Sequence, residues 1–309
     1  MLVLCEEDIF KCLFLLQIIH FFDNMFLGGY MKQPEKWKET VDPFSIKFNN
    51  FKLLEVLGYP HARNDVFYCK GIYKNEEVLC FVKYASKEDS NIKKEIKTLN
   101  ALNFDFLPEI IDFDKDGKFI VTKEIVGDRL SYILQTTNHK SIDYMFEYGK
   151  TLATIHLTNL DCDKVAYRKF FDIPSPDYLK ENQIDFVLNF LNENKPSQIT
   201  DCFCHGDFHY ANILWKDKKI SAVLDWELSG IGNKEFDIAW AIINRPSQKF
   251  LKTDKEVKEF LKGYASINNY NFEHVKYYMI LIYSHFISVN KKDSKYKKFV
   301  IKWLKRKIK

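Results

Sequence analysis

The feature that most constrains this chain of 309 residues is the spacing of three polar residues in its second half. Asp207 lies five residues before Asn212, and Asp225 follows the apolar run Ala222–Leu224. Carboxylate and amide oxygens are hard ligands that suit divalent cations, and a carboxylate can also orient an attacking hydroxyl group. The spacing therefore predicts phosphoryl transfer, with Asn212 and Asp225 as metal ligands and Asp207 as catalytic base or hydroxyl orienter.

The neighbouring residues carry weaker signals, because His-Gly-Asp alone is most often a simple turn. Glu227 is either a further metal ligand or a salt-bridge partner. His205 is expected to pin the loop, whereas His209 either decorates the loop or lies next to substrate or metal. Asp237 is expected to cap the following helix or to tie down the loop.

The stretch from Cys204 to Ala241 resembles the aminoglycoside phosphotransferase family of small-molecule kinases. That family has H-G-D-x-x-x-x-N, then D-x-(D/E), a glycine-containing turn and D-(L/I)-A. Here the pattern is met by His205-Gly206-Asp207 with Asn212, by Asp225-Trp226-Glu227 and by Asp237-Ile238-Ala239. Choline and homoserine kinases are relatives of the family. The resemblance implies an α+β, bilobal protein-kinase-like fold, with an antiparallel β-rich N-lobe, a mostly helical C-lobe and the nucleotide between them.

The rest of the chain fits this expectation, because short β-prone runs precede a mainly helical region. Strands are predicted at 51–57, 66–73, 78–85, 110–113 and 119–125, with a helix at 87–102. Further helices are predicted at 142–156, where His156 lies on the buried face, and at 178–191, 257–265, 274–288 and the chain end. Residues 45–127 would form the nucleotide-binding N-lobe and 128–309 the C-lobe with the catalytic loop and substrate site.

The resemblance also implies a lysine that holds the α- and β-phosphates and a helix glutamate that orients it. Lys83 lies in an apolar strand, where an unpaired ammonium group would be unfavourable. Glu95 is followed by apolar residues at helical spacing and is the expected partner, with Glu88 as the alternative.

Two further nucleotide contacts follow from the same resemblance. Gly58 begins the segment where a phosphate-covering loop belongs, although this chain lacks G-x-G-x-x-G there. The stretch Thr122–Gly127 resembles the hinge, where backbone groups near Glu124 and Val126 would bond the adenine. The implied co-substrate is ATP or GTP, with Mg²⁺.

The formal net charge of +4 conceals an uneven distribution. Residues 291–309 hold ten basic residues and one acidic residue, which leaves 36 basic and 41 acidic residues elsewhere. A nucleic-acid binder is disfavoured, because its basic residues should line a groove and not one terminus. The acidic body suits a polycationic acceptor, and the basic end is expected to form a packed helix with a solvated lysine face.

The seven cysteines include no C-x-x-C pair, so neither a disulfide framework nor a zinc site is predicted. Free thiols indicate a reducing cytoplasm. Residues 1–44 form an N-terminal extension, and its apolar stretch Ile9–Leu27 is interrupted by polar residues, so no membrane span is expected. A true start at Met31 is a further hypothesis for this segment.

These features predict a kinase that transfers a γ-phosphoryl group to a hydroxyl of an aminoglycoside-like acceptor, with Mg²⁺. The alternatives are a choline, ethanolamine or homoserine kinase, and a nucleotide-binding pseudokinase. A protein kinase is less favoured, because Asp225 and Asp237 leave little room for a peptide-binding activation segment. The oligomeric state is left open.

Overall fold

The computed structural model describes residues 41–60, 64–88, 90–197, 201–288 and 294–308. The chain divides into two compact units, and the second begins at Asp128. Ser221–Leu228 packs with the first unit although it lies far downstream in the sequence. The proposed start at Met31 and nearly all of the segment 1–44 lie outside the described residues.

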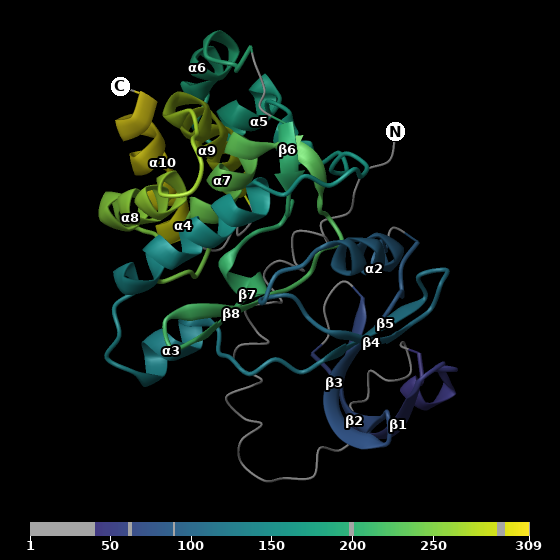
Figure 1. The fold of residues 1–309 in the computed structure, drawn as a ribbon. Helices are drawn as coiled ribbons and strands as arrows, with labels where there is room; N and C mark the ends of the chain where they lie inside the picture. The colour runs from purple at the N-terminus through teal and green to yellow at the C-terminus, as the bar shows by residue number, and fades with distance from the viewer. Residues whose placement is uncertain (1–40, 61–63, 89, 198–200, 289–293, 309) are drawn as a thin grey trace. The chain divides into compact units, whose positions relative to one another are not determined.

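The first unit is built on an antiparallel sheet with strand order β1-β2-β3-β5-β4, drawn in purple and blue in Figure 1. A short 3-10 helix, η2, precedes the sheet, and the helix α2 contacts β4 and β5. The elements are η2 (Pro43–Ser45), β1 (Phe51–Gly58), β2 (Asp65–Tyr73), β3 (Glu76–Tyr84), α2 (Ile92–Ala101), β4 (Ile110–Phe113) and β5 (Phe119–Lys123).

In β2 the side chains alternate between buried and partly exposed positions, and a tight turn joins β2 to β3. Phe67 and Cys69 of β2 are fully buried, and Cys69 is paired in register with the buried Cys80 of β3. Lys74 and Asn75 join these strands with φ values of 50° and 66°. Two consecutive positive φ values match the right-handed twist of a two-residue hairpin. The five predicted strands are confirmed to within two residues at each end.

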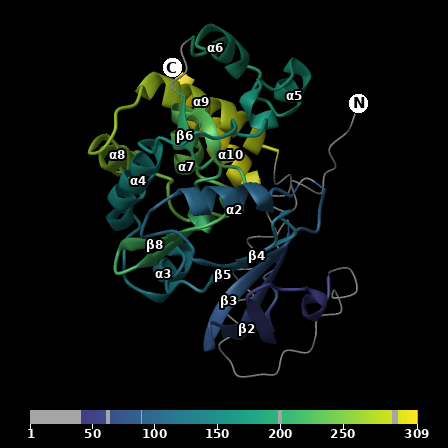
Figure 2. The same ribbon diagram turned by 45° about the vertical axis from the view of Figure 1, so that its right-hand side comes forward.

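The second unit is mainly helical and is coloured teal to yellow in Figures 1 and 2. It contains two small antiparallel pairings, β6 with β9 and β7 with β8, the last of which runs on into the first unit. The elements are α3 (Leu130–Thr136), α4 (Ile142–His156), η3 (Lys169–Phe171), α5 (Pro176–Glu181), α6 (Val187–Glu193), β6 (Asp201–Cys204), η4 (Tyr210–Asn212), β7 (Ile213–Lys216), β8 (Lys219–Val223), β9 (Gly230–Asn233), α7 (Lys234–Ile242), α8 (Asp254–Ala265), α9 (Phe272–Phe286) and α10 (Ser294–Ile308).

Several helices differ from the sequence prediction. The helix predicted at 178–191 is wrong as a single element, because Gln183 adopts a positive φ of 62° and separates α5 from α6. The helix predicted from Lys87 begins only at Ile92, after a turn in which Ser90 N–H donates to the Lys87 carbonyl. The sequence did not predict α3 or β9. Within the described part of the chain, no helix is long and apolar enough to cross a membrane.

Helices α4 and α8 lie side by side in both views and cross at two glycines (Figures 1 and 2). A Cβ atom on Gly149 would lie 1.9 Å from the carbonyl oxygen of Phe260. A Cβ atom on Gly263 would lie 1.9 Å from the carbonyl oxygen of Phe146. Both obstacles are backbone atoms, so any side chain at either position must push the helices apart.

We expect Gly149→Ala to lower the free energy of unfolding by about 1–3 kcal/mol, because the overpacked crossing must open. This net loss appears even though alanine favours helix over glycine by about 1 kcal/mol. Urea unfolding of the full chain measures it. Lys150→Ala, at the next position of α4, serves as the control and should change stability little. Equal stability of Gly149→Ala and the parent chain would contradict the crossing described here.

The start of α8 is organised by Glu256, which forms a capping box with Thr253. The Glu256 carboxylate accepts hydrogen bonds from the backbone N–H groups of Leu251, Lys252 and Thr253 at 2.9–3.1 Å. It also accepts one from the Ser141 hydroxyl, 2.7 Å away, next to the start of α4. Burial acts to raise the pKa of Glu256, but these donors lower it below its usual value.

Glu256→Gln is expected to lower the free energy of unfolding at pH 7 by about 1–3 kcal/mol, because an amide replaces an acceptor of several charge-assisted bonds. A depressed pKa in the folded state stabilises the protein above the ordinary glutamate value of 4.5. The difference between the two proteins should therefore shrink as the pH falls below that value. Denaturant unfolding at several pH values tests this, with Glu259→Gln on the same helix as the control.

Candidate active site

Lys83 lies at the centre of an ion cluster in the first unit. Its Nζ atom is 2.8 Å from Glu95 Oε2 and 2.9 Å from Asp225 Oδ1, and it also contacts Glu227 Oε1. Strand β3 is paired on both sides, with β2 and β5, which fixes the position of Lys83. The fold thus brings together four residues that the sequence singled out, and Glu95 is the helix residue that pairs with Lys83.

The acidic members of the cluster differ in exposure. Glu227 is buried and accepts hydrogen bonds from Asn64 Nδ2 at 2.6 Å and from the backbone N–H of Asn91 at 3.2 Å. The Asp225 side chain is 45% exposed. Glu227 is therefore held by donors of the protein, whereas Asp225 is open to a ligand from solvent.

The backbone at Asp225 adopts a left-handed conformation, with φ of 64°. A residue other than glycine keeps this conformation only where its surroundings hold it. The next residue, Trp226, is fully buried, and its indole N–H donates to the Val223 carbonyl oxygen at 2.9 Å. Its backbone N–H donates to Glu95 Oε1 at 3.3 Å. This anchor holds the backbone at Asp225 in its left-handed conformation.

The cluster carries more negative than positive charge. Burial opposes the charge on Lys83, but the carboxylates of Asp225, Glu95 and Glu227 raise its pKa well above the usual value. Burial, together with the negative charges of Asp225 and Glu227, raises the pKa of Glu95 even beside the ammonium group. Carboxylate oxygens of the three acids lie within 4.8 Å of one another. Three hard oxygen donors with excess negative charge fit a divalent cation such as Mg²⁺.

The other residues predicted to bind nucleotide lie outside this cluster. Gly58 ends β1, opposite Tyr68 of β2, and Tyr68 donates its hydroxyl to Glu124 Oε1 at 2.9 Å. The backbone N–H of Glu124 donates to the Leu79 carbonyl, so this group belongs to the sheet. Val126 is 68% exposed. Residues 61–63 of the expected phosphate-covering loop lie outside the described residues.

Asp207 lies in the second unit, in the loop between β6 and β7. The preceding Gly206 has φ of 79°, a left-handed conformation that favours glycine. Asp207 Oδ1 accepts a hydrogen bond from Trp240 Nε1 at 2.8 Å, and Oδ2 accepts one from Asn212 Nδ2 at 3.2 Å. His209 Nε2 lies 3.4 Å from Oδ2. Both carboxylate oxygens are therefore held in fixed directions.

The charge state of Asp207 follows from these neighbours. Burial acts to raise its pKa, but the imidazole of His209 and the guanidinium groups of Arg168 and Arg245 hold the pKa well below the usual range. Asp207 is therefore a carboxylate throughout the physiological pH range. Such a weak base is better suited to orient a hydroxyl group than to remove its proton early in a reaction.

The amide of Asn212 is oriented by Asp207. Its Nδ2 atom donates both to the Asp207 backbone carbonyl at 3.1 Å and to the carboxylate. The remaining polar atom of the side chain is the carbonyl oxygen, which can bind a hard cation but cannot donate a hydrogen bond. The structure thus brings Asn212 and Asp207 together in the second unit, whereas Lys83 and Asp225 belong to the first.

Asp237 anchors the start of the loop between β6 and β7. Its Oδ2 atom accepts a hydrogen bond from the backbone N–H of His205 at 3.1 Å. His205 Nδ1 in turn accepts the backbone N–H of Asp207 at 3.2 Å. The prediction that these two residues pin the loop is confirmed. Asp237 does not cap α7, because Asn233 is the capping residue.

His156 is buried, as predicted, and both ring nitrogens have partners. Nδ1 lies 2.7 Å from the Tyr264 hydroxyl and Nε2 lies 3.2 Å from Asp237 Oδ2. The thiols of Cys202 and Cys204 are 3.8 Å apart, and ligand atoms of both lie within 4.8 Å of one of His156. This network packs α4 and α8 against β6, the strand that leads into the loop of Asp207.

Sequence reasoning missed three residues of this region. Asn64 holds Glu227, and Trp240 holds Asp207. Trp240 directly follows the D-(L/I)-A pattern, so its indole N–H could have been suspected as a donor. Arg168 belongs to no recognised motif, and only the fold places its guanidinium group 3.9 Å from the centre of the Trp240 ring.

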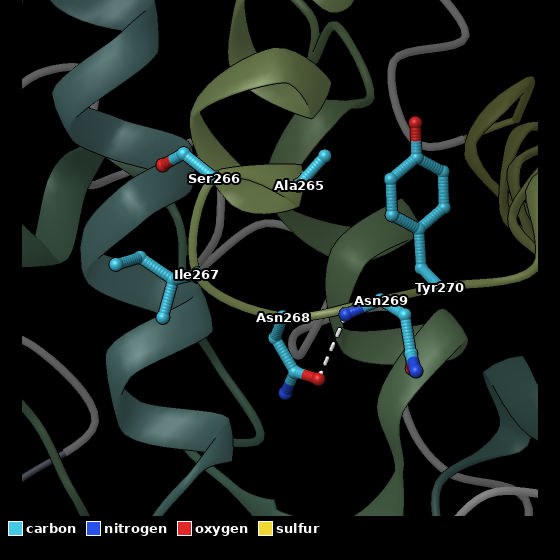
Figure 3. A pocket seen from close by; sticks show the side chains of 6 residues that line it. All are labelled: Ala265, Ser266, Ile267, Asn268, Asn269 and Tyr270. Atoms are coloured by element: carbon cyan, nitrogen blue, oxygen red, sulfur yellow. Dashed lines mark hydrogen bonds between the residues drawn. The ribbon is translucent and has the colours of Figure 1, made fainter.

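A surface pocket lies away from these residues in sequence, in the connection between α8 and α9 (Figure 3). Its lining comes from one continuous stretch: Ala265, Ser266, Ile267, Asn268, Asn269 and Tyr270. The Asn268 side-chain oxygen accepts the backbone N–H of Asn269 at 2.9 Å. The lining contains no acid, base or thiol, and none of the predicted site residues contributes to it.

Comparison with solved structures identifies the same fold in kinases of small molecules. A streptomycin–ATP ternary complex of APH(2")-IIa covers 91% of this chain and 99% of that chain, with 15% identity and a TM-score of 0.53. The choline kinase LicA from Streptococcus pneumoniae covers 85% of this chain and 94% of that chain, with 17% identity and a TM-score of 0.53. At these identities the likeness concerns the fold, and the predicted α+β, protein-kinase-like fold is confirmed.

A short stretch of this chain also matches a much longer curated protein. Over 59 residues the chain is 41% identical to acyl-CoA dehydrogenase family member 11 of Mus musculus. The match covers 18% of this chain and spans only 8% of that relative's length.

A sequence model described as the phosphotransferase enzyme family, APH, matches residues 62–271. That range is about two thirds of the chain, and it contains Lys83, Glu95, Asp207, Asn212 and Asp225. The chain therefore belongs to the APH family of phosphotransferase enzymes.

Proposed function

We propose that this protein is a small-molecule kinase, which transfers the γ-phosphoryl group of ATP or GTP to a hydroxyl group. The observation that carries the proposal is the ion cluster on Lys83. A buried ammonium group with three carboxylates is an expensive arrangement to maintain for stability alone, because hydrophobic residues often serve as well. It is well suited to a ligand that brings both phosphate groups and a divalent cation.

In this function Lys83 binds the α- and β-phosphates and Glu95 orients it. The ammonium group is preorganised, because three carboxylates already hold it in place. The adenine would lie along the segment after β5, near the carbonyl of Glu124 and the exposed Val126. Gly58 would allow close approach of the backbone to the phosphates.

Asp207 is proposed to accept the hydrogen bond of the acceptor hydroxyl and to aim its oxygen at the γ-phosphorus. The O–H proton passes to Asp207 or to solvent late in the transfer, since a weak base contributes mainly by positioning. Trp240 and Asn212 keep the carboxylate from rotating. The low pKa of Asp207 keeps its carboxyl group ionised at neutral pH, so that it can accept this hydrogen bond.

Asn212 and Asp225 are the residues we propose to hold Mg²⁺, with Glu227 either as a further ligand or as the support of Lys83. When bound, the cation neutralises the charge that the transferred phosphoryl group carries. The exposed carboxylate of Asp225 and the free direction of the Asn212 carbonyl support this assignment. A non-catalytic nucleotide-binding role is disfavoured, because all of these positions are occupied by competent residues.

The acceptor follows from the family and not from a recognised pocket. The family alone makes an aminoglycoside the first acceptor to test, with choline, ethanolamine and homoserine as the alternatives. The test is ATP and GTP consumption by the purified full chain with Mg²⁺ against these compounds. Turnover that requires both one acceptor and Mg²⁺ supports the proposal. Nucleotide binding without any acceptor-dependent turnover would favour the non-catalytic role.

A further inference from the structure

Arg168 lies directly beside the residue that we assign to orient the acceptor. Its guanidinium carbon is 3.9 Å from the centre of the Trp240 ring, and its Nη1 atom donates to the backbone carbonyl of Gly206. Trp240 in turn donates its indole N–H to Asp207. A positive charge is thus connected to Asp207 by two short routes, one through the indole and one through the preceding peptide group.

A second guanidinium group reinforces this charge. The guanidinium carbon of Arg245 lies 4.9 Å from the centre of the same Trp240 ring, and Nη2 donates to the Trp240 carbonyl at 2.8 Å. Both arginines act on the Asp207 carboxylate, since each contributes to lowering its pKa. The acid of the same segment, Asp172, accepts the hydroxyl of the exposed Tyr167.

This arrangement disfavours a cationic acceptor. Ammonium groups bind proteins through carboxylates or through aromatic faces. Here the face of Trp240 already contacts two guanidinium groups, and the carboxylate of Asp207 is required for the hydroxyl. A polycation placed next to Asp207 would face like charges from Arg168 and Arg245, the two guanidinium groups that act on this carboxylate, and juxtaposed like charges suppress binding of the wrong partner.

We propose that the acceptor is an anionic alcohol, whose carboxylate or phosphate group binds Arg168. The proposal rests on the kinase function above and specifies its substrate class. Arg168 is half-buried and forked, which suits two-point recognition of an anionic group.

The experiment compares acceptors that differ in charge at similar size, using the purified full chain with ATP and Mg²⁺. Choline is the cation, 3,3-dimethylbutanol its neutral counterpart and 4-hydroxybutyrate the carboxylate. Glycerol and glycerol 3-phosphate form a second pair, which separates phosphate from carboxylate recognition. An aminoglycoside is included as the polycation. We expect an anionic compound to give the highest kcat/KM, and calorimetric binding of each acceptor provides a second reading.

The variants are Arg168→Gln, Arg168→Glu and the control Lys140→Gln, which removes an exposed charge before α4. Arg168→Gln should raise KM for the anionic acceptor about tenfold to hundredfold and leave KM for neutral acceptors and ATP nearly unchanged. Arg168→Glu should raise KM for anionic acceptors further and lower KM for cationic acceptors. Lys140→Gln should behave as the parent chain.

The failures of the two proposals are distinguishable. Turnover that favours choline or an aminoglycoside overturns the anionic acceptor and leaves the kinase function standing. An equal loss of kcat for all acceptors in Arg168→Gln also overturns it, because Arg168 would then only position the loop at Gly206. If no compound of either charge binds or stimulates ATP consumption, both proposals fail.

Discussion

Asp207→Asn is expected to lower kcat by about 10²–10⁴-fold, the usual contribution of a positioned acid–base group. The asparagine keeps the shape of the side chain. Its NH₂ group, however, would face one of the two donors that bind a carboxylate oxygen in the parent chain, either Trp240 Nε1 or Asn212 Nδ2. It can no longer accept a hydroxyl hydrogen bond as a carboxylate does. ATP affinity should be unchanged, because the Lys83 cluster belongs to the other unit.

Steady-state kinetics with the best acceptor and calorimetric ATP binding check this expectation. Asp217→Asn is the matched control, since Asp217 is an exposed residue of the β7–β8 turn with φ of 50°, which asparagine tolerates. The parent chain should also lose no turnover through protonation of Asp207 down to about pH 5, because the pKa of this group lies well below the usual value near 4. Retained turnover in Asp207→Asn would remove Asp207 from its proposed role.

Lys83→Met is expected to lower kcat/KM for ATP by about 10²–10³-fold, as removal of one preorganised charge commonly does. It should also lower the free energy of unfolding by about 3 kcal/mol, because Glu95 and Glu227 would remain buried without their counter-ion. The raised pKa of Lys83 means that its stabilising charge is present below the ordinary lysine value of 10.5 and is lost only at more alkaline pH.

ATP titration and urea unfolding at neutral pH measure the two effects separately. Lys52→Met, at an exposed position of β1, is the control for the change of residue type. An unchanged KM for ATP in Lys83→Met would sink the proposal that Lys83 binds the phosphates, even if stability falls. Loss of ATP binding without loss of stability would show that the cluster serves the nucleotide alone.

The strands and most helices could be predicted from the sequence because their signals are local. The alternation of apolar residues in β2 and β3, and the spacing of Asp207 and Asn212, depend on neighbours only a few residues away. The prediction of a single helix at 178–191 was wrong because it too relied on local spacing alone. The apolar pattern continues from α5 into α6. The chain nevertheless leaves the helix between Glu181 and Val187, where Gln183 adopts a positive φ.

The partners of the site residues could not be predicted with the same certainty. The sequence left Glu88 and Glu95 as alternatives, and packing of α2 against the sheet brings Glu95 to Lys83. The sequence likewise gave no particular partner for Glu227, and the fold brings Lys83 and Asn64, the latter 163 residues away in the chain, to its carboxylate. Such contacts depend on how distant elements pack, which no local spacing encodes.

The sequence by itself determined the family and the five strands of the first sheet, and it singled out Asp207, Asn212 and Asp225 as candidates, because each of these depends on short-range spacing. Only the tertiary structure decided which charges meet. It gathered three carboxylates on Lys83, and it placed the guanidinium group of Arg168 against Trp240 and therefore beside Asp207. The physical reason is that electrostatic interactions depend on distance in space. That distance is set by the packing of elements far apart in the chain.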